Sequence, residues 1–146
     1  MQSLRGIGEF GFIERMKRLI TLDSSVIKGS GDDCAVVAFT KEQYLLATCD
    51  MVIEGVDFTA RENPYLIGRK ALAVSISDIA ACGGIPRYAL VSLAVPRATS
   101  LKKADMIARG FLDLAKVYNV NVIGGDISRA EHITLDVTVL GMVEKK

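Results

Sequence analysis

Hydrophobic residues recur at helical spacing in three parts of the chain, and this pattern predicts three helices. The three segments are residues 9–20, 63–82 and 100–115. The second begins at Asn63-Pro64 and the third at Ser100, residue types that cap or open a helix. Within the second, residues 71–81 are almost entirely apolar or small. We therefore expect this helix to be buried on most sides.

Apolar runs of strand length predict a sheet between and after these helices. The runs are residues 35–39, 44–48, 87–95, 120–123 and 133–140. The polar stretch 40–43 has hairpin length, so the first two strands should pair antiparallel. The last run alternates strictly between apolar and polar residues, which predicts one face in the core and one face toward solvent or a partner.

This order of elements predicts an α+β fold with a mixed or mostly antiparallel sheet and helices packed on one face. With 146 residues, half of them hydrophobic, the chain is long enough for one domain, 1–146, and too short for two ordinary ones. The uncovered face of the sheet needs a second layer, so we expect a dimer or a further domain there.

Charge and cysteine content narrow the classes of function. The 18 basic and 17 acidic residues nearly cancel, and no basic stripe is visible, so a nucleic-acid partner is not expected. The three cysteines form no C-x-x-C pair, which speaks against a zinc site or a disulfide framework. No apolar stretch reaches membrane-spanning length and no signal peptide is recognisable, so we expect a cytoplasmic protein that does not enter membranes.

Acidic residues stand where the predicted strands begin or end. Asp33 precedes the first strand, Asp50 follows the second, and Asp126 follows the strand 120–123. If these carboxylates converge at one edge of the sheet, they repel one another unless cations lie between them, and oxygen ligands suit Mg²⁺. The alternative is that each Asp caps its own loop.

Asp78 is an acidic residue inside the apolar helix, where an ionised carboxylate is costly unless it is paired or binds a metal. The alternative is that it faces a packing gap and hydrogen-bonds to Ser75 or to a backbone donor. His132 is the only histidine and has no nucleophile beside it, so Ser/His/Asp or Cys/His catalysis is not indicated.

Two glycine-containing turns would let backbone approach a phosphate group closely. They are Gly29–Gly31 and Gly124–Gly125, each followed by Asp. Neither matches a P-loop or a dinucleotide-binding fingerprint, so those two nucleotide-binding modes are not supported.

Five motifs, in this order, resemble those of the thiamine-monophosphate kinase family. They are Gly8–Ile13, Gly31–Ala35, Thr48–Phe58, Lys70–Ala81 and Gly124–Asp126. The wider superfamily includes aminoimidazole ribonucleotide synthetase, selenophosphate synthetase and a hydrogenase maturation factor. Within this superfamily, the sequence motifs E-G-V-x-F and S-D-I-A-A favour the kinase.

The resemblance implies a fold like the aminoimidazole ribonucleotide synthetase N-terminal domain, dimerising through its sheet, with ATP and Mg²⁺ near the interface. It implies direct transfer of a phosphoryl group from ATP to thiamine monophosphate, which yields thiamine diphosphate. Such a reaction needs positioning and charge neutralisation by metal ions and no protein nucleophile. Accordingly, no catalytic side chain is expected.

The resemblance also assigns roles to individual residues. Metal ligands would be Asp33, Thr48, Cys49, Asp50, Asp78 and Asp126. Nucleotide-binding residues would be Asp33, Tyr118, Gly125 and Asp126. Substrate-binding residues would be Asp57 and Asp78.

Two departures from the family's residues, together with the chain length, leave other functions open. Asp57 stands where the family usually has His, and Cys49 where it often has Thr. Family members also carry a C-terminal domain that we expect to be absent here, so the chain alone is expected to turn over nothing. The alternatives are an ATP-using member of the superfamily with a different acceptor, or a non-catalytic nucleotide-binding or dimerisation module.

Overall fold

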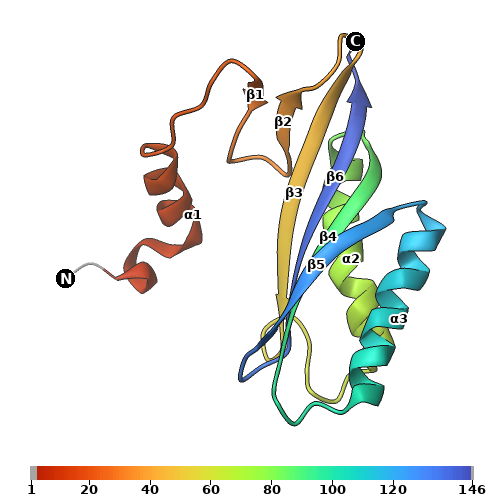
Figure 1. Cartoon of the computed structure of the whole chain (residues 1–146). Coiled ribbons are helices and arrows are strands. Elements are labelled where there is room, and N and C mark those ends of the chain that lie inside the picture. The colour runs from red at the N-terminus through yellow and green to blue at the C-terminus, as the bar shows by residue number, and fades with distance from the viewer. Residues whose placement is uncertain (1–2, 146) are drawn as a thin grey trace.

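The computed structural model describes residues 3–145 as one twisted sheet with two helices against one of its faces (Figure 1). The elements are α1 (Leu4–Lys17), β1 (Val26–Lys28), β2 (Ala35–Ala38), β3 (Gln43–Ile53), α2 (Pro64–Ala81), β4 (Ile85–Val95), α3 (Leu101–Val117), β5 (Asn121–Arg129) and β6 (Thr134–Glu144).

The six strands lie in the order β1-β2-β3-β6-β4-β5. All neighbours pair antiparallel except β4 and β5, which are parallel and joined through α3. The last strand, β6, therefore lies in the middle of the sheet between β3 and β4. The α+β fold with a mixed sheet is confirmed, as is the antiparallel hairpin of β2 and β3.

The core lies between the sheet and α2, and the alternation along β6 shows it most clearly. Leu135, Val137 and Val139 are at most 1% exposed and face the helices. Thr134 and Asp136 alternate with them and are half-buried on the opposite, open face. The prediction of one buried and one open face for this strand is thus confirmed.

Both predicted helix starts are confirmed by capping hydrogen bonds. The Asn63 side chain accepts from the Tyr65 amide at 3.0 Å, and the Ser100 hydroxyl accepts from the Lys103 amide at 3.2 Å. The two helices then pack very closely, because a Cβ on Gly68 would overlap the carbonyl oxygen of Ile107. Glycine is required at this crossing for a steric reason, not for its conformational freedom.

The strands β3 and β5 are longer than the sequence predicted. β3 continues to Ile53 because its backbone pairs with β6 along its whole length, and β5 continues to Arg129 beside β4. Asp50 and Asp126 therefore lie inside strands and not after their ends, which corrects the expected placement. Gly125 likewise belongs to a strand, where a Cβ would overlap the Val91 carbonyl oxygen of β4.

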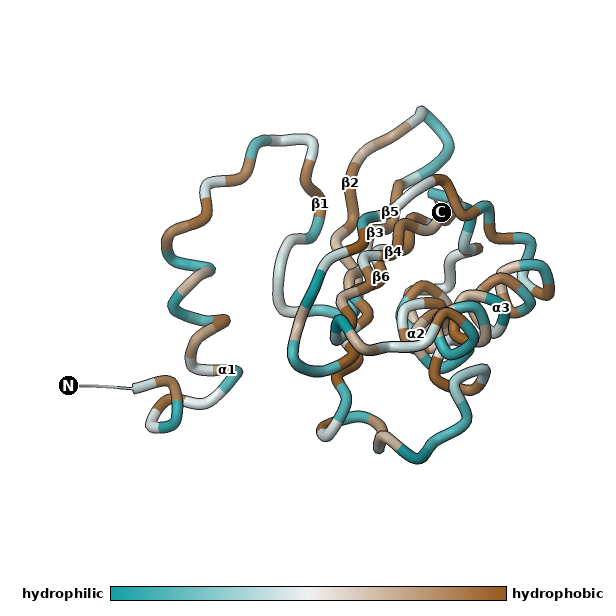
Figure 2. The backbone as a smooth tube through the Cα atoms, turned by 60° about the horizontal axis from the view of Figure 1, so that its bottom comes forward, coloured by the Kyte–Doolittle hydropathy of each residue, from teal (hydrophilic) through white to brown (hydrophobic). Residues whose placement is uncertain are grey.

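The helix α1 stands apart from the sheet and does not join the layer formed by α2 and α3 (Figures 1 and 2). It begins and ends earlier than predicted, is interrupted at Gly8 with φ of 65°, and contains no buried residue. Phe10 is 81% exposed. Only two of the three helices thus pack on the sheet. Among the described residues, no helix is long and apolar enough to cross a membrane.

Candidate functional site

Three polar side chains meet between β3 and α2 in an otherwise apolar layer. The alternation of β3 directs Thr48 and Asp50 toward the helices, in line with the buried Leu46 and Val52. Asp78 reaches them from α2, and the Thr48 hydroxyl donates a hydrogen bond to its Oδ2 atom at 2.8 Å. This Thr48–Asp50–Asp78 group is the centre of the candidate site.

Asp78 carries the electrostatic signature of a partly desolvated carboxylate. Burial raises its pKa above the ordinary value, and the neighbouring Asp50 raises it further, while the hydrogen bond from Thr48 acts in the opposite direction. Ser75 does not compensate Asp78, because its hydroxyl donates to the Val137 carbonyl at 3.0 Å. The prediction of Ser75 as the partner of Asp78 is therefore wrong, and the donor to Asp78 is the Thr48 hydroxyl.

Asp50 contains the unsatisfied atom of the site. Its Oδ2 atom is buried and finds no hydrogen-bond partner among the described residues. A buried carboxylate oxygen without a partner is costly, and buried charges are normally paired or bind a metal. Asp50 and Asp78 thus fit a divalent cation, since such an ion would satisfy this oxygen and relieve their repulsion.

The protein alone does not complete a metal centre. Within residues 3–145, no group of three or more His, Cys, Asp or Glu side chains is arranged to hold an ion. This arrangement suits Mg²⁺, which is usually bound through one or two carboxylates and keeps several waters or substrate phosphates as its other ligands.

Asp33 lies in the loop before β2. It is exposed, and the next residue, Cys34, is buried. Burial raises the pKa of the Cys34 thiol to about 12, with contributions from the Cys82 thiol and from the negative charges of Asp78 and Asp33. Asp33 is therefore the residue directly before a buried thiol whose pKa also responds to the charge of Asp78.

Cys49 and Asp126 lie on the other, open face of the sheet. Cys49 is exposed and its thiol donates to Asp136 Oδ1 at 2.9 Å. Ser92 of β4 pairs with Asp136 on one side and with Asp126 on the other, which aligns the two carboxylates across this face. The six predicted metal ligands are therefore divided between two faces of the sheet.

Asp136 is a site candidate that the sequence reading missed. The signal was present, because position 136 is a charged residue on the alternating strand 133–140. The alternation alone does not show which residues lie beside Asp136. Only the pairing of β6 with β3 and β4 brings Cys49 and Ser92 next to it.

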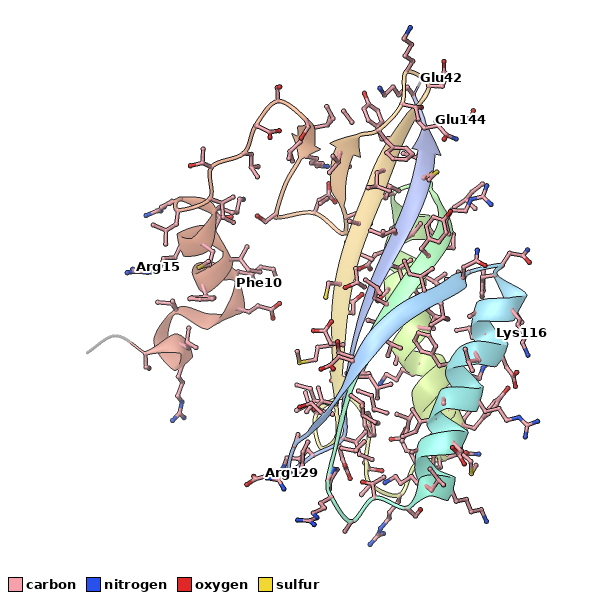
Figure 3. The ribbon with its side chains drawn as sticks, in the orientation of Figure 1. Phe10, Arg15, Glu42, Lys116, Arg129 and Glu144 are labelled. Carbon is pink, nitrogen blue, oxygen red and sulfur yellow. The ribbon has the colours of Figure 1, made fainter. Side chains whose placement is uncertain are left out.

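The predicted nucleotide-binding residues Tyr118 and Gly125 belong to different elements, α3 and β5. Tyr118 caps the C-terminal end of α3 and is 49% exposed. Gly125 lies in the middle of β5, which runs from this end toward Arg129. Figure 3 shows Lys116 and Arg129 at different ends of this helix and strand unit.

Asp57, a predicted substrate-binding residue, has a structural contact of its own. One oxygen of its carboxylate accepts a hydrogen bond from the Ile53 amide at 2.8 Å, and the Lys70 ammonium group donates to its backbone carbonyl. Asp57 therefore closes the loop that follows β3.

Comparison with known proteins places this geometry in a family. Residues 31–143 match the family model of AIR synthase related protein, N-terminal domain. The chain belongs to this family. The matched segment begins after α1 and includes all three residues of the Thr48–Asp50–Asp78 group.

Curated relatives extend the similarity to nearly the whole chain. It is 37% identical to a thiamine-monophosphate kinase of Aquifex aeolicus over 97% of its own length and 44% of the relative's length. It is 41% identical to the thiamine-monophosphate kinase of Bacillus subtilis over 94% of its length and 43% of the relative's length. The resemblance that the motifs indicate is confirmed, and the chain spans less than half of these relatives.

A solved structure of AaThiL complexed with AMPPCP and TMP shares the arrangement of the elements. It superposes with a TM-score of 0.90 at 36% identity and covers 99% of this chain and 45% of that chain. That relative was thus solved with an ATP analogue and TMP bound. The alignment extends over α1, which contacts no other helix or strand among residues 3–145.

Proposed function

We propose that this chain binds ATP with Mg²⁺ and takes part in phosphoryl transfer from ATP to thiamine monophosphate. The observation that carries the proposal is the buried, unpartnered Oδ2 atom of Asp50 beside Asp78. The relatives that bear the name thiamine-monophosphate kinase support the choice of acceptor.

In this proposal Asp50 and Asp78 hold the cation, and Thr48 keeps Asp78 oriented through its hydrogen bond. A bound Mg²⁺ neutralises charge on the phosphate groups and helps to align the reacting oxygens. Asp33, in the exposed loop before β2, supplies a further carboxylate or a water-mediated contact. The protein groups position and neutralise, and no side chain acts as a nucleophile.

The open face of the sheet has a second part in the proposal. Cys49 and Asp126 would bind a further cation there, and Tyr118 and Gly125 would contact the nucleotide. We propose that a second copy of the chain covers this face, because Met51 is 53% and Leu90 is 41% exposed on it. This arrangement corresponds to the expected homodimer, and we propose a cytoplasmic location for it.

The acceptor is the point at which a second candidate remains. The Asp57 carboxylate is engaged with the Ile53 amide, so the group at this position differs in charge and in availability from the usual His of the family. A different phosphoryl acceptor within the superfamily is the alternative that this observation favours. Turnover assays with thiamine monophosphate, on a protein that includes the remainder of the relatives' length, would distinguish the two.

Titration calorimetry of AMPPCP into the chain, with and without MgCl₂, tests the nucleotide-binding proposal. We expect binding that depends on Mg²⁺ and weakens about tenfold or more in Asp50→Asn, because the charge that holds the cation is lost. Asp105→Asn is the matched control, since Asp105 is an exposed carboxylate on α3. Binding that is independent of Mg²⁺, or equal in both variants, would contradict the proposal.

A further inference from the structure

Two cysteines from distant parts of the sequence meet at the end of α2. Ala35 and Val36 pair with Ala47 and Leu46 of β3, so the alternation of β2 directs Cys34 toward the helices, next to Thr48. Cys34 is 1% exposed, and Cys82, the C-cap residue of α2, packs against the core cluster that contains it.

The register across α2 and β3 agrees with this placement. Asp78 is fixed above Thr48 by their hydrogen bond, and Cys82 follows Asp78 by one helical turn on the same side of α2. After burial, the neighbouring Cys82 thiol is the next cause of the raised pKa of Cys34, which agrees with this placement. The third cysteine, Cys49, lies on the opposite face of the sheet, where its thiol donates a hydrogen bond to Asp136.

We propose that Cys34 and Cys82 are a modification site: a disulfide oxidant such as glutathione disulfide converts them into an intramolecular disulfide. The sequence contains no C-x-x-C spacing that would have indicated this pair. It arises only because β2 and the end of α2 are adjacent in the fold.

The exposure of the two thiols sets the order of the steps. Cys82 is half-buried and the more accessible of the two, so its thiolate attacks a sulfur of glutathione disulfide and releases one glutathione. The Cys34 thiol then attacks the Cys82 sulfur; its proton passes to the departing glutathione sulfur, which leaves as the second glutathione. Two protein thiols are oxidised, and one glutathione disulfide is reduced to two glutathione molecules.

The disulfide would act on the candidate site from both sides. Cys34 directly follows Asp33, and Cys82 lies one turn beyond Asp78. A covalent bond between them would restrain both carboxylates, so we expect nucleotide affinity to differ between the reduced and the oxidised chain. This second consequence rests on the proposed function, whereas formation of the disulfide does not.

Mass spectrometry of Cys49→Ser protein, which lacks the exposed thiol, tests disulfide formation. After incubation with glutathione disulfide, we expect the mass of the chain to fall by that of two hydrogen atoms. Proteolysis without reduction should then release the Cys34 peptide and the Cys82 peptide as one disulfide-linked species. The oxidised chain should also melt at least about 5 °C higher than the reduced chain, because the bond closes a long loop. The additional variant Cys82→Ser should show neither change.

A glutathione adduct that persists at Cys82, or two thiols that remain free to alkylation, would overturn the proposed disulfide. Calorimetry with AMPPCP and Mg²⁺ on the reduced wild-type chain, and on both redox forms of Cys49→Ser, then separates the two proposals. If the reduced wild-type chain does not bind, the proposed function fails while the disulfide stands on its mass. If both forms bind equally, the disulfide stands and its effect on the site is refuted.

Discussion

The two faces of the central strands differ in chemistry although both are formed by the same strands. Toward the helices, the apolar layer of Leu135 and Val137 is interrupted by the Thr48–Asp50–Asp78 group and by the buried Ser75. On the open face, the Cys49 thiol donates a hydrogen bond to Asp136 in contact with solvent. A contiguous motif such as 48–51 thus supplies two different environments, because neighbouring strand residues point to opposite faces.

Removing apolar volume from the helix-covered face should have the largest effect on stability. Leu135→Ala should lower the free energy of unfolding by roughly 2–5 kcal/mol, because Leu135 is 1% exposed and a cavity would remain. Thr134→Ala, at the neighbouring position on the open face, should lower the free energy of unfolding by less than about 1 kcal/mol. Urea unfolding followed by circular dichroism measures both, and equal losses would contradict the assignment of the faces.

Removing the hydroxyl that pairs with Asp78 should have the next largest effect. Thr48→Val keeps the shape of the side chain but removes its donor, so the free energy of unfolding should fall by about 1–3 kcal/mol. Thr138→Val, on the open face of β6, is the matched control and should change stability little. If the two variants unfold at the same urea concentration, the Thr48–Asp78 bond contributes nothing measurable.

Neutralising Asp78 should stabilise the chain in the absence of metal. Its pKa is raised in the folded state by burial and by Asp50, so ionisation at neutral pH opposes folding. The wild-type chain in EDTA should therefore gain stability as the pH falls from neutral through the folded pKa toward the unfolded value. Asp78→Asn should melt a few degrees higher at pH 7 and lose this part of the pH dependence.

The matched change on the open face is Asp136→Asn, which should leave that pH profile in place. Thermal melts of both variants in EDTA at several pH values make the comparison. An Asp78→Asn chain that melts lower than wild type at neutral pH would show that the carboxylate is compensated without a cation.

Changing the open-face thiol should have the smallest effect. Cys49→Ser retains a donor to Asp136 at an exposed position, so the melting temperature should stay within a degree or so of wild type. The same substitution should not change binding of Mg²⁺ between Asp50 and Asp78. A large loss of stability would place Cys49 in the core, against the alternation of β3.

Much of the fold is predictable from local signals. Asn63-Pro64 and Ser100 mark helix starts through hydrogen bonds made within a few residues, and the alternation of 133–140 reports which side chains the helices cover. These features depend on near neighbours in the sequence. They could be read without any knowledge of which strands pair.

What the sequence did not predict depends on pairing between distant segments. Asp50 lies inside a strand only because β6 pairs with β3 beyond the apolar run 44–48, and Asp136 gains its partners from the same pairing. The separation of Cys49 from Thr48 follows from strand geometry once the strand is known to continue. The isolated position of α1 cannot be derived from its apolar spacing, which predicts a buried face and not where that face is covered.

A crystal structure of the chain with AMPPCP and Mn²⁺ in place of Mg²⁺ would test the central claim most directly, because anomalous scattering locates the metal. We expect an ion on the helix-covered face, bound to the buried oxygen of Asp50 and to the Asp78 carboxylate. Manganese found only on the open face, beside Asp126 and Asp136, would contradict it.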